Sequence, residues 1–146
     1  PGNVGALLRT GLACAAAGAV CVGRSDAFHP KAVRTSLGSL FKLPLVHTPS
    51  AEALLAELAR HGVHALATVA RGGERLERAR WPEGTLALLM GNEGQGLPEA
   101  ISSAADGRVR IDLSEEVDSF SVNAAAAICL YEIQRRRSAS MAGLVP

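Results

Sequence analysis

A short segment of the chain contains three glycines within six residues. It reads Gly91-Asn92-Glu93-Gly94-Gln95-Gly96-Leu97 and follows a strongly apolar run. Because glycine has no side chain, a ligand can come close to the backbone N–H and C=O groups of such a segment. The spacing G-x-x-G-x-G differs from the dinucleotide fingerprint and from the P-loop, and the Glu93 carboxylate would repel a polyphosphate. The segment therefore predicts either a tight structural turn or a binding loop for a ligand that carries positive charge.

The positive charge of the chain is carried mainly by arginine. Thirteen of the 15 basic residues are Arg, but 14 acidic residues leave a formal net charge of +1. This excludes a global field that attracts polyanions, so any nucleic-acid binding must be local. Lys31, Arg34 and Lys42 form a candidate group for binding RNA phosphates. A composition rich in Ala and Arg can also simply reflect a GC-rich genome.

The cysteines indicate neither a disulfide framework nor a metal site. Cys14, Cys21 and Cys129 lie in apolar neighbourhoods, without a C-x-x-C pair or His at metal-ligand spacing. We expect reduced, buried thiols in a cytoplasmic protein without a bound metal. The uncharged stretch 10–23 is broken by glycine and too short to span a bilayer, so we expect no export signal and no membrane partner.

The elements that must position these residues alternate along the chain. The 146 residues suit one ordinary domain, and 48% of them are hydrophobic. Continuous apolar runs, typical of parallel strands covered on both faces, alternate with segments of helical periodicity. The sequence therefore predicts an α/β fold, with a mostly parallel sheet covered by helices on both faces. Such sheets bind ligands beyond the carboxyl ends of their strands, where the 91–97 segment lies.

Capping residues and glycines set the bounds of the predicted elements. Asn3 caps the first helix, which ends near Gly18, and Ser119 begins the longest helix. The longest predicted helix runs to Arg137. The other predicted helices are Pro30–Ser36, Ser50–Gly62 and Pro98–Ala105. The predicted strands are Ala19–Val22, Leu43–His47, Val63–Val69, Thr85–Met90 and Val109–Leu113.

Three stretches of the chain together resemble a known family. They are Pro1–Arg9 (PGNVGALLR), Gly91–Leu97 (GNEGQGL), and Ser119–Ala125 (SFSVNAA) with the Leu-Tyr-Glu of residues 130–132. In this order they resemble the three motifs of the SpoU-type RNA ribose 2′-O-methyltransferases of the SPOUT superfamily. A further block, Asp26–Pro44, also matches family usage. The resemblance spans nearly the whole chain.

The resemblance implies a methyl donor and an assembly. The donor is S-adenosylmethionine, the product S-adenosylhomocysteine, and no metal is needed. The resemblance also implies a C-terminal trefoil knot, although chains as a rule do not thread loops. It further implies a homodimer whose interface uses the last helix and whose catalytic residues can come from both subunits. By position, the donor would be held by Gly91, Ile111 and Phe120, with Leu89 and Asn92 nearby.

Arg9 is the catalytic residue that the resemblance implies. Methylating a ribose hydroxyl requires the oxygen to attack the sulfonium methyl in line while its proton leaves. A guanidinium rarely loses its proton, so Arg9 is a poor base. We therefore interpret Arg9 as the group that grips an RNA phosphate and orients the hydroxyl, with a phosphate oxygen or water receiving the proton.

Three further residues are candidate members of the catalytic site. Asn3 is either a helix cap or an active-site hydrogen bonder, and both roles are compatible. Glu93 either meets a nearby amide within its turn or fixes Arg9 or Asn3 across the site. Ser119 either caps the last helix or serves in the active site, as the resemblance implies.

The chain also departs from the family pattern. The third motif usually reads Ser-Leu-Asn-Val-Ser, whereas residues 119–123 read Ser-Phe-Ser-Val-Asn. Two residues along a helix correspond to a rotation of about 200°, so Asn123 does not simply replace the missing amide at Ser121. The strand that normally precedes the first motif is absent, and the chain begins at Pro1. We therefore expect the catalytic domain of a longer protein.

These observations favour one function over two alternatives. We expect residues 1–138 to form a catalytic domain, with a tail at 139–146, that methylates a ribose 2′-hydroxyl of tRNA or rRNA. The first alternative is a non-catalytic RNA- or nucleotide-binding module that retains the knotted fold. The second is a doubly wound enzyme that acts on a small nucleotide.

Overall fold

The computed structural model describes residues 1–141, with the backbone alone at residues 140 and 141. The chain forms two compact units. The helical unit comprises Pro1–His47 and the chain from Asn123 onward, and the sheet unit comprises Thr48–Val122. The predicted tail beyond residue 141 lies outside the described residues, and the domain bounds stay a prediction.

Two crossing helices and a pair of short strands form the N-terminal part of the helical unit. The elements are α1 (Gly2–Ala13), β1 (Ala19–Val22), α2 (Pro30–Ser36), the 3-10 helix η1 (Ser39–Phe41) and β2 (Leu45–Thr48). β1 is hydrogen-bonded to β2. Leu8 of α1 is buried in one core with Cys21, Ala27, Leu40 and Leu43. The long helix α5 (Val122–Met141) completes the chain that the structure describes.

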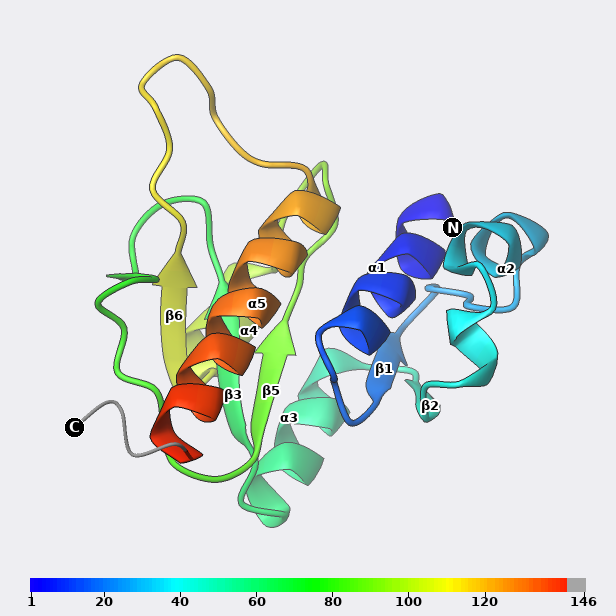
Figure 1. Cartoon of the computed structure of the whole chain (residues 1–146), viewed down its shortest axis with the longest axis horizontal. Coiled ribbons are helices and arrows are strands. Elements are labelled where there is room, and N and C mark those ends of the chain that lie inside the picture. The colour runs from blue at the N-terminus through cyan, green and yellow to red at the C-terminus, as the bar shows by residue number, and fades with distance from the viewer. Residues whose placement is uncertain (142–146) are drawn as a thin grey trace. The chain divides into compact units, whose positions relative to one another are not determined.

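Helices α1 and α2 lie against each other with almost no space between their backbones (Figure 1). A Cβ atom at Gly5 would lie closer than 3.0 Å to the Ala32 carbonyl oxygen and to Thr35 Oγ1. Thr35 Oγ1 lies 3.0 Å from the Gly2 carbonyl oxygen. The first motif of the chain is therefore anchored on α2, and Gly5 permits the close approach.

The sheet unit contains a four-stranded parallel sheet. Its elements are α3 (Ala51–Arg60), β3 (His64–Thr68), β4 (Glu74–Arg75), β5 (Leu86–Leu89), α4 (Glu99–Ala104) and β6 (Gly107–Arg110). The strand order is β4-β6-β3-β5, and β3 pairs in parallel with β5 and β6. Figure 1 shows the arrowheads of β5 and β6 pointing the same way. The carboxyl ends of these strands therefore meet at one edge of the sheet.

The central strand of this sheet is covered on both faces. Ala65, Leu66 and Ala67 are all buried, although successive side chains of a strand point to opposite faces. On one face, Ala65 and Leu89 pack with Ile101 of α4 and with the leucines of α3. This burial confirms the predicted α/β class with buried parallel strands. The predicted trefoil knot stays a prediction.

Several predicted bounds are confirmed and others are wrong. The strand at Ala19–Val22 and the helix at Pro30–Ser36 have the predicted residues. Helix α3 begins near Ser50 as predicted, and the Ser50 Oγ caps it by accepting a hydrogen bond from the Ala53 N–H at 3.1 Å. The last strand is Gly107–Arg110 rather than Val109–Leu113, and the strands form two separate hydrogen-bonded sheets rather than one.

The prediction of both ends of the first helix is wrong. Asn3 lies inside the first turn, Pro1 occupies the N-cap position, and no side chain caps the helix. At the other end, Ala16 N donates to the Gly11 carbonyl and Ala15 N to the Leu12 carbonyl. This pair of bonds is a Schellman motif, with the left-handed position filled by Ala15 (φ 56°) rather than by glycine. The helix therefore ends well before Gly18.

The last helix begins at Val122, so Ser119 does not cap it. All side chains from residue 114 to residue 121 are exposed. Without a buried face, these residues have no packing to stabilise a helical turn. The segment forms a loop instead, and α5 begins at the first buried residue, Val122.

Candidate active site

The glycine segment 91–97 forms a loop that closes on itself. The Gly96 N–H donates to the Asn92 carbonyl at 2.9 Å, and the Asn92 N–H donates to the Gly96 carbonyl at 3.3 Å. A Cβ atom at Gly91 would lie closer than 3.0 Å to backbone atoms of Gly96 and Leu97. Gly91 is therefore required by the backbone that folds over it, and residues 92–96 remain exposed.

The Asn92 side chain shapes the interior of this loop. Its Oδ1 accepts hydrogen bonds from two consecutive backbone N–H groups at the tip of the turn, that of Gly94 at 3.1 Å and that of Gln95 at 2.7 Å. An Asn side chain that accepts from the backbone two and three residues ahead stabilises a turn. Asn92, which the sequence predicts to lie near the methyl donor, therefore holds the loop in shape.

The sheet brings three of the predicted donor-binding positions to one edge. Leu89 ends β5, and in the register of the sheet it lies opposite Ala67 of β3. Val109 of β6 lies opposite Thr68, so Ile111 leaves the sheet beside the end of β3. The loop that begins at Gly91 leaves the same edge two residues after Leu89. Leu89 itself is buried, and its carbonyl accepts a hydrogen bond from Thr68 Oγ1 at 2.9 Å.

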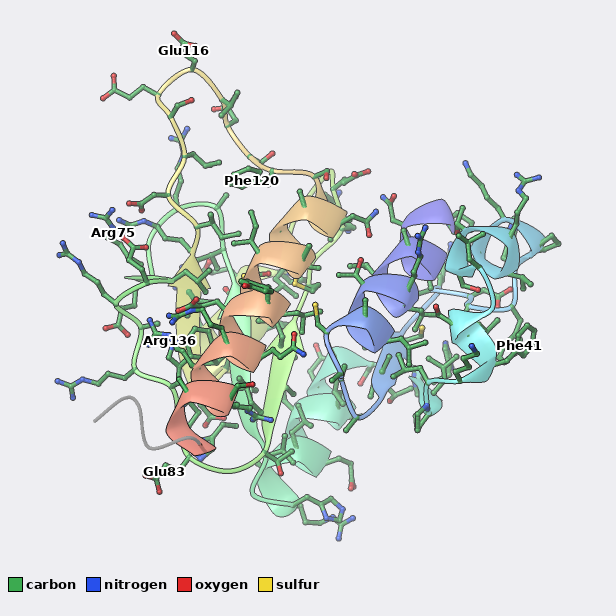
Figure 2. The ribbon with its side chains drawn as sticks, in the orientation of Figure 1. Phe41, Arg75, Glu83, Glu116, Phe120 and Arg136 are labelled. Carbon is green, nitrogen blue, oxygen red and sulfur yellow. The ribbon has the colours of Figure 1, made fainter. Side chains whose placement is uncertain are left out.

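A long exposed loop joins β6 to α5 and carries two more predicted residues. Figure 2 shows Glu116 at its tip and Phe120 close to the start of α5. The Phe120 side chain is 41% exposed, and Ser119 beside it is also exposed. Arg71 Nη2 lies 3.2 Å from Asp118 Oδ1, an ion pair that ties this loop to the segment after β3. The loop therefore offers an accessible aromatic ring within the sheet unit.

Helix α1 presents the two predicted catalytic residues of the first motif in different directions. Arg9 and Asn3 are six residues apart, which places them about 120° apart around the helix axis. Arg9 is exposed and forms no hydrogen bond or ion pair with the residues that the structure describes. It lies on the stripe of α1 that also contains Gly2 and Gly5, one or two turns away from them.

The three predicted phosphate-binding residues also lie in the helical unit, and all are exposed. Lys31 and Arg34 are one turn apart on α2, and Lys42 follows η1. The aliphatic part of Lys31 covers Gly2, since a Cβ atom there would lie 3.0 Å from Lys31 Cε. The sequence interpretation missed the exposed aromatic rings of the same unit: Phe28 is 67% and Phe41 is 74% exposed. Figure 2 shows Phe41 on the outer surface of this unit.

The structure also joins two residues that the sequence interpretation kept apart. Asn123, in the first turn of α5, donates from Nδ2 to Asn3 Oδ1 in the first turn of α1, at 3.4 Å. The Asn123 Oδ1 is buried and has no hydrogen-bond partner among the described residues. The partners are 120 residues apart, so no local pattern could have indicated this pair.

The remaining predicted site residue, Glu93, is exposed on the loop of the sheet unit. Its role stays a prediction, as do the catalytic roles of Arg9, Asn3 and Ser119. The predicted donor residues therefore lie in the sheet unit, and the predicted RNA residues lie in the helical unit together with Arg9 and Asn3.

The ionisable groups with shifted pKa values lie elsewhere. The hydrogen bond from Arg135 is the largest cause that lowers the pKa of Glu132 to about 2; partial burial opposes it, and Arg136 adds to it. Burial raises the pKa of the Cys129 thiol to about 11 and also raises that of Cys21. Cys14 is only half-buried, which corrects the expectation that all three thiols are buried. Within residues 1–141, no group of three or more His, Cys, Asp or Glu side chains could hold a metal ion.

Comparison with known proteins identifies relatives of the same kind that the sequence motifs resemble. The family model described as the SpoU rRNA Methylase family matches residues 1–131. The 23S rRNA (guanosine(2553)-2′-O)-methyltransferase RlmP of Bacillus subtilis is 33% identical over 136 residues, which are 92% of this chain and 54% of that protein. The chain thus spans about half the length of the curated relatives that it matches.

Solved structures give the same result. The SpoU methyltransferase AviRb from Streptomyces viridochromogenes in complex with AdoMet matches with a TM-score of 0.85 and 34% identity, over 94% of this chain and 54% of that one. A structure described as giving insights into the 2-OH methylation of C/U34 on tRNA matches with a TM-score of 0.82 and 29% identity, over 94% of this chain and 90% of that one. In the described part of this chain, no helix combines the length and hydrophobicity needed to cross a membrane.

Proposed function

Because this chain belongs to the SpoU rRNA Methylase family, we propose that it transfers a methyl group from S-adenosylmethionine to a ribose 2′-hydroxyl of rRNA or tRNA. The observation that carries the proposal is the arrangement of the sheet edge, where the closed glycine loop and Ile111 leave the two parallel strands that flank β3. AviRb, a relative with the same fold, is described in complex with AdoMet. We also propose that the protein acts in the cytoplasm.

The residues at the sheet edge fit the methyl donor. The loop exposes backbone groups between Asn92 and Gly96, while Ile111 and Phe120 add apolar surface. Backbone N–H and C=O groups can recognise the edge of an adenine ring, and apolar side chains can cover its faces. Glu93 adds one negative charge to the loop, which suits a positively charged sulfonium ligand better than a polyphosphate. We therefore assign the donor to the sheet unit.

The residues of the helical unit fit the RNA. Lys31, Arg34 and Lys42 are exposed cations that can neutralise backbone phosphates, and Arg9 is an exposed guanidinium. In the transfer, the ribose oxygen forms the new O–CH3 bond as the S–CH3 bond breaks, and the sulfonium becomes a neutral thioether. The hydroxyl proton leaves to a phosphate oxygen or to water, because Arg9 stays protonated and orients the reacting groups.

We also propose that the protein is a homodimer. The side chains of Ile128 and Tyr131 on α5 are 36% and 63% exposed, and their spacing of three residues places them on one face of the helix. An exposed apolar helix face of this kind favours burial against a second copy. The mass of the protein in solution, measured by light scattering, tests this assembly.

Methyl transfer tests the proposed activity directly. Labelled S-adenosylmethionine is incubated with transcribed 23S rRNA and with a pool of transcribed tRNAs, for the wild type and for Arg9→Ala. We expect incorporation into one of these RNAs and a loss of at least about 100-fold in the variant, the size typical for an essential orienting group.

Binding of the product separates the enzyme from the non-catalytic alternative. S-adenosylhomocysteine should raise the melting temperature of the wild type and of Arg9→Ala equally, because a ligand that binds only the folded state stabilises it. RNA binding without methyl incorporation would favour a non-catalytic binding module. This alternative is specific to this chain because Ser121 and Asn123 stand in exchanged order relative to the family's third motif. Incorporation that persists unchanged in Arg9→Ala would remove the role assigned to that residue.

A further inference from the structure

The contact between Asn3 and Asn123 joins the first and third motifs of the chain. Each residue lies in the first turn of its helix, and each is half-buried. At 3.4 Å, the distance from Asn123 Nδ2 to Asn3 Oδ1 is longer than that of a typical hydrogen bond. The pair therefore links two separate motifs at one point of the helical unit.

The other end of the Asn123 amide lacks a partner. Its Oδ1 is buried and accepts no hydrogen bond from the described residues. A buried acceptor without a donor destabilises the folded state, so most such groups in proteins are paired. Alanine at this position would remove the unpaired oxygen and would favour the helix, as the neighbouring residues 124–127 already do. Stability of the fold therefore does not explain an asparagine here.

The position of the pair indicates which ligand supplies the missing donor. Asn3 and Asn123 belong to the unit that contains Arg9 and the exposed cations Lys31 and Arg34. A ribose hydroxyl is both a hydrogen-bond donor and an acceptor, and it is the group that distinguishes RNA from DNA. An amide pair with one unused carbonyl is suited to such a group.

We propose that the Asn3–Asn123 pair is a ribose-binding element of the RNA substrate site. Asn123 fixes the Asn3 side chain through its Nδ2, and its Oδ1 accepts a hydrogen bond from a ribose hydroxyl of the bound RNA. This inference rests on the proposed function, and it assigns a role to a residue that the shifted third motif would otherwise leave without one. Asn123 acts on the RNA and leaves the affinity for the methyl donor unchanged.

The test compares RNA kinetics with product binding in four proteins: the wild type, Asn123→Ala, the isosteric Asn123→Asp, and a control, Gln134→Ala, on the same helix. We expect Asn123→Ala to lower kcat/KM for the methylated RNA at least about 10-fold, the loss typical of one hydrogen bond. Asn123→Asp should lower it at least as much, because its carboxylate would repel Asn3 Oδ1. Both should bind S-adenosylhomocysteine within about twofold of the wild type, and Gln134→Ala should match the wild type in both assays.

A double-mutant cycle makes the test specific to the pair. Because Asn123 both fixes Asn3 and contacts the ribose directly, the double variant Asn3→Ala/Asn123→Ala should lose more activity than Asn3→Ala alone but less than the product of the two single losses. Additive losses, full activity of Asn123→Ala, or a loss of S-adenosylhomocysteine affinity equal to the loss of activity would each overturn the inference. A wild type that methylates neither rRNA nor tRNA would instead contradict the proposed function, and the inference would fail with it.

Discussion

Gly5 of α1 and Gly91 of the loop both lie where a Cβ atom would collide with neighbouring atoms, but the neighbours differ in kind. At Gly5 they are the Ala32 carbonyl and the Thr35 hydroxyl on a second helix. At Gly91 they are backbone atoms of Gly96 and Leu97, within the same loop. The first glycine is therefore needed for helix packing, and the second is needed for the shape of one loop.

This difference separates stability from binding. The contact at Gly5 holds together α1 and α2, the two helices that contain Arg9, Lys31 and Arg34. The closure at Gly91 involves few buried apolar atoms, and residues 92–96 remain exposed. A change at Gly5 should therefore affect folding first, whereas a change at Gly91 should affect the proposed donor site first.

Gly91→Ala should produce the largest effect on binding. The new Cβ would force the loop to open, because the atoms that it meets are backbone and cannot rotate away. We expect the affinity for S-adenosylhomocysteine to fall by about 100-fold or more, measured by calorimetry, while the folded state loses about 1–3 kcal/mol. Gly94→Ala is the matched control, since its Cβ would meet only Asn92 Oδ1 at an ordinary 3.8 Å. Equal losses in the two variants would contradict the role of loop closure.

Gly5→Ala should produce the largest effect on stability. Either α1 and α2 must separate or the backbone must bend, at a cost of about 2–4 kcal/mol in the free energy of unfolding. For a chain of this size, we expect the melting temperature to fall by roughly 5–15 °C. Gly11→Ala is the control on the same helix, because its Cβ would make only ordinary contacts at 3.7 Å. A Gly5→Ala protein that melts with the control would show that the close approach of the two helices is not required.

The sequence predicted three of the strands well because local patterns encode them. Continuous apolar runs identified β1, β3 and β5 within one or two residues, and the glycine segment after β5 is the loop that closes at the sheet edge. The Ser50 cap was predictable because the donor, Ala53 N–H, is three residues away. These features depend on residues that are close in the chain.

Features that depend on distant residues were not predictable. The need for glycine at position 5 comes from α2, and the contact of Asn3 comes from a residue 120 positions later. The first helix ends at a Schellman motif with Ala15 in the left-handed conformation, which has no glycine to reveal it. The late start of α5 depends on which residues are buried in the folded protein. Tertiary packing, and not local propensity, decides each of these points.

An acid titration should distinguish the helical unit from the glycine loop 91–97. The expected effect is smaller than those of the glycine variants, and the test needs no substitution that alters the backbone. Glu132 lies on α5 in the helical unit, and its side chain is 17% exposed. Arg135 and Arg136 lower its pKa to about 2 from an ordinary value of 4.5. Because the folded-state pKa is lowered, this carboxylate stabilises the fold fully above its ordinary pKa of 4.5, and the stabilisation is lost as the pH falls toward about 2.

Glu132→Gln tests that assignment. The substitution should lower the free energy of unfolding by about 1–2 kcal/mol at neutral pH, as expected for charge-assisted hydrogen bonds. It should also flatten the fall in melting temperature between about pH 5 and pH 2 relative to the wild type. Glu52→Gln, on the exposed surface of α3, serves as the control. An acid profile that is identical in Glu132→Gln and the wild type would show that other carboxylates dominate the acid response.

Asn92→Ala should give the smallest effect and defines how the loop keeps its shape. The substitution removes the acceptor of two backbone N–H groups, but both are exposed and can bind water instead. We expect a loss of about 0.5–1 kcal/mol in stability and a loss of roughly fivefold in S-adenosylhomocysteine affinity, which corresponds to about 1 kcal/mol. Asn92→Asp keeps an oxygen at the same place and should retain most of the affinity. If both variants lost affinity equally, the amide nitrogen of Asn92 would have to contact the ligand, and its role would be binding instead of loop closure.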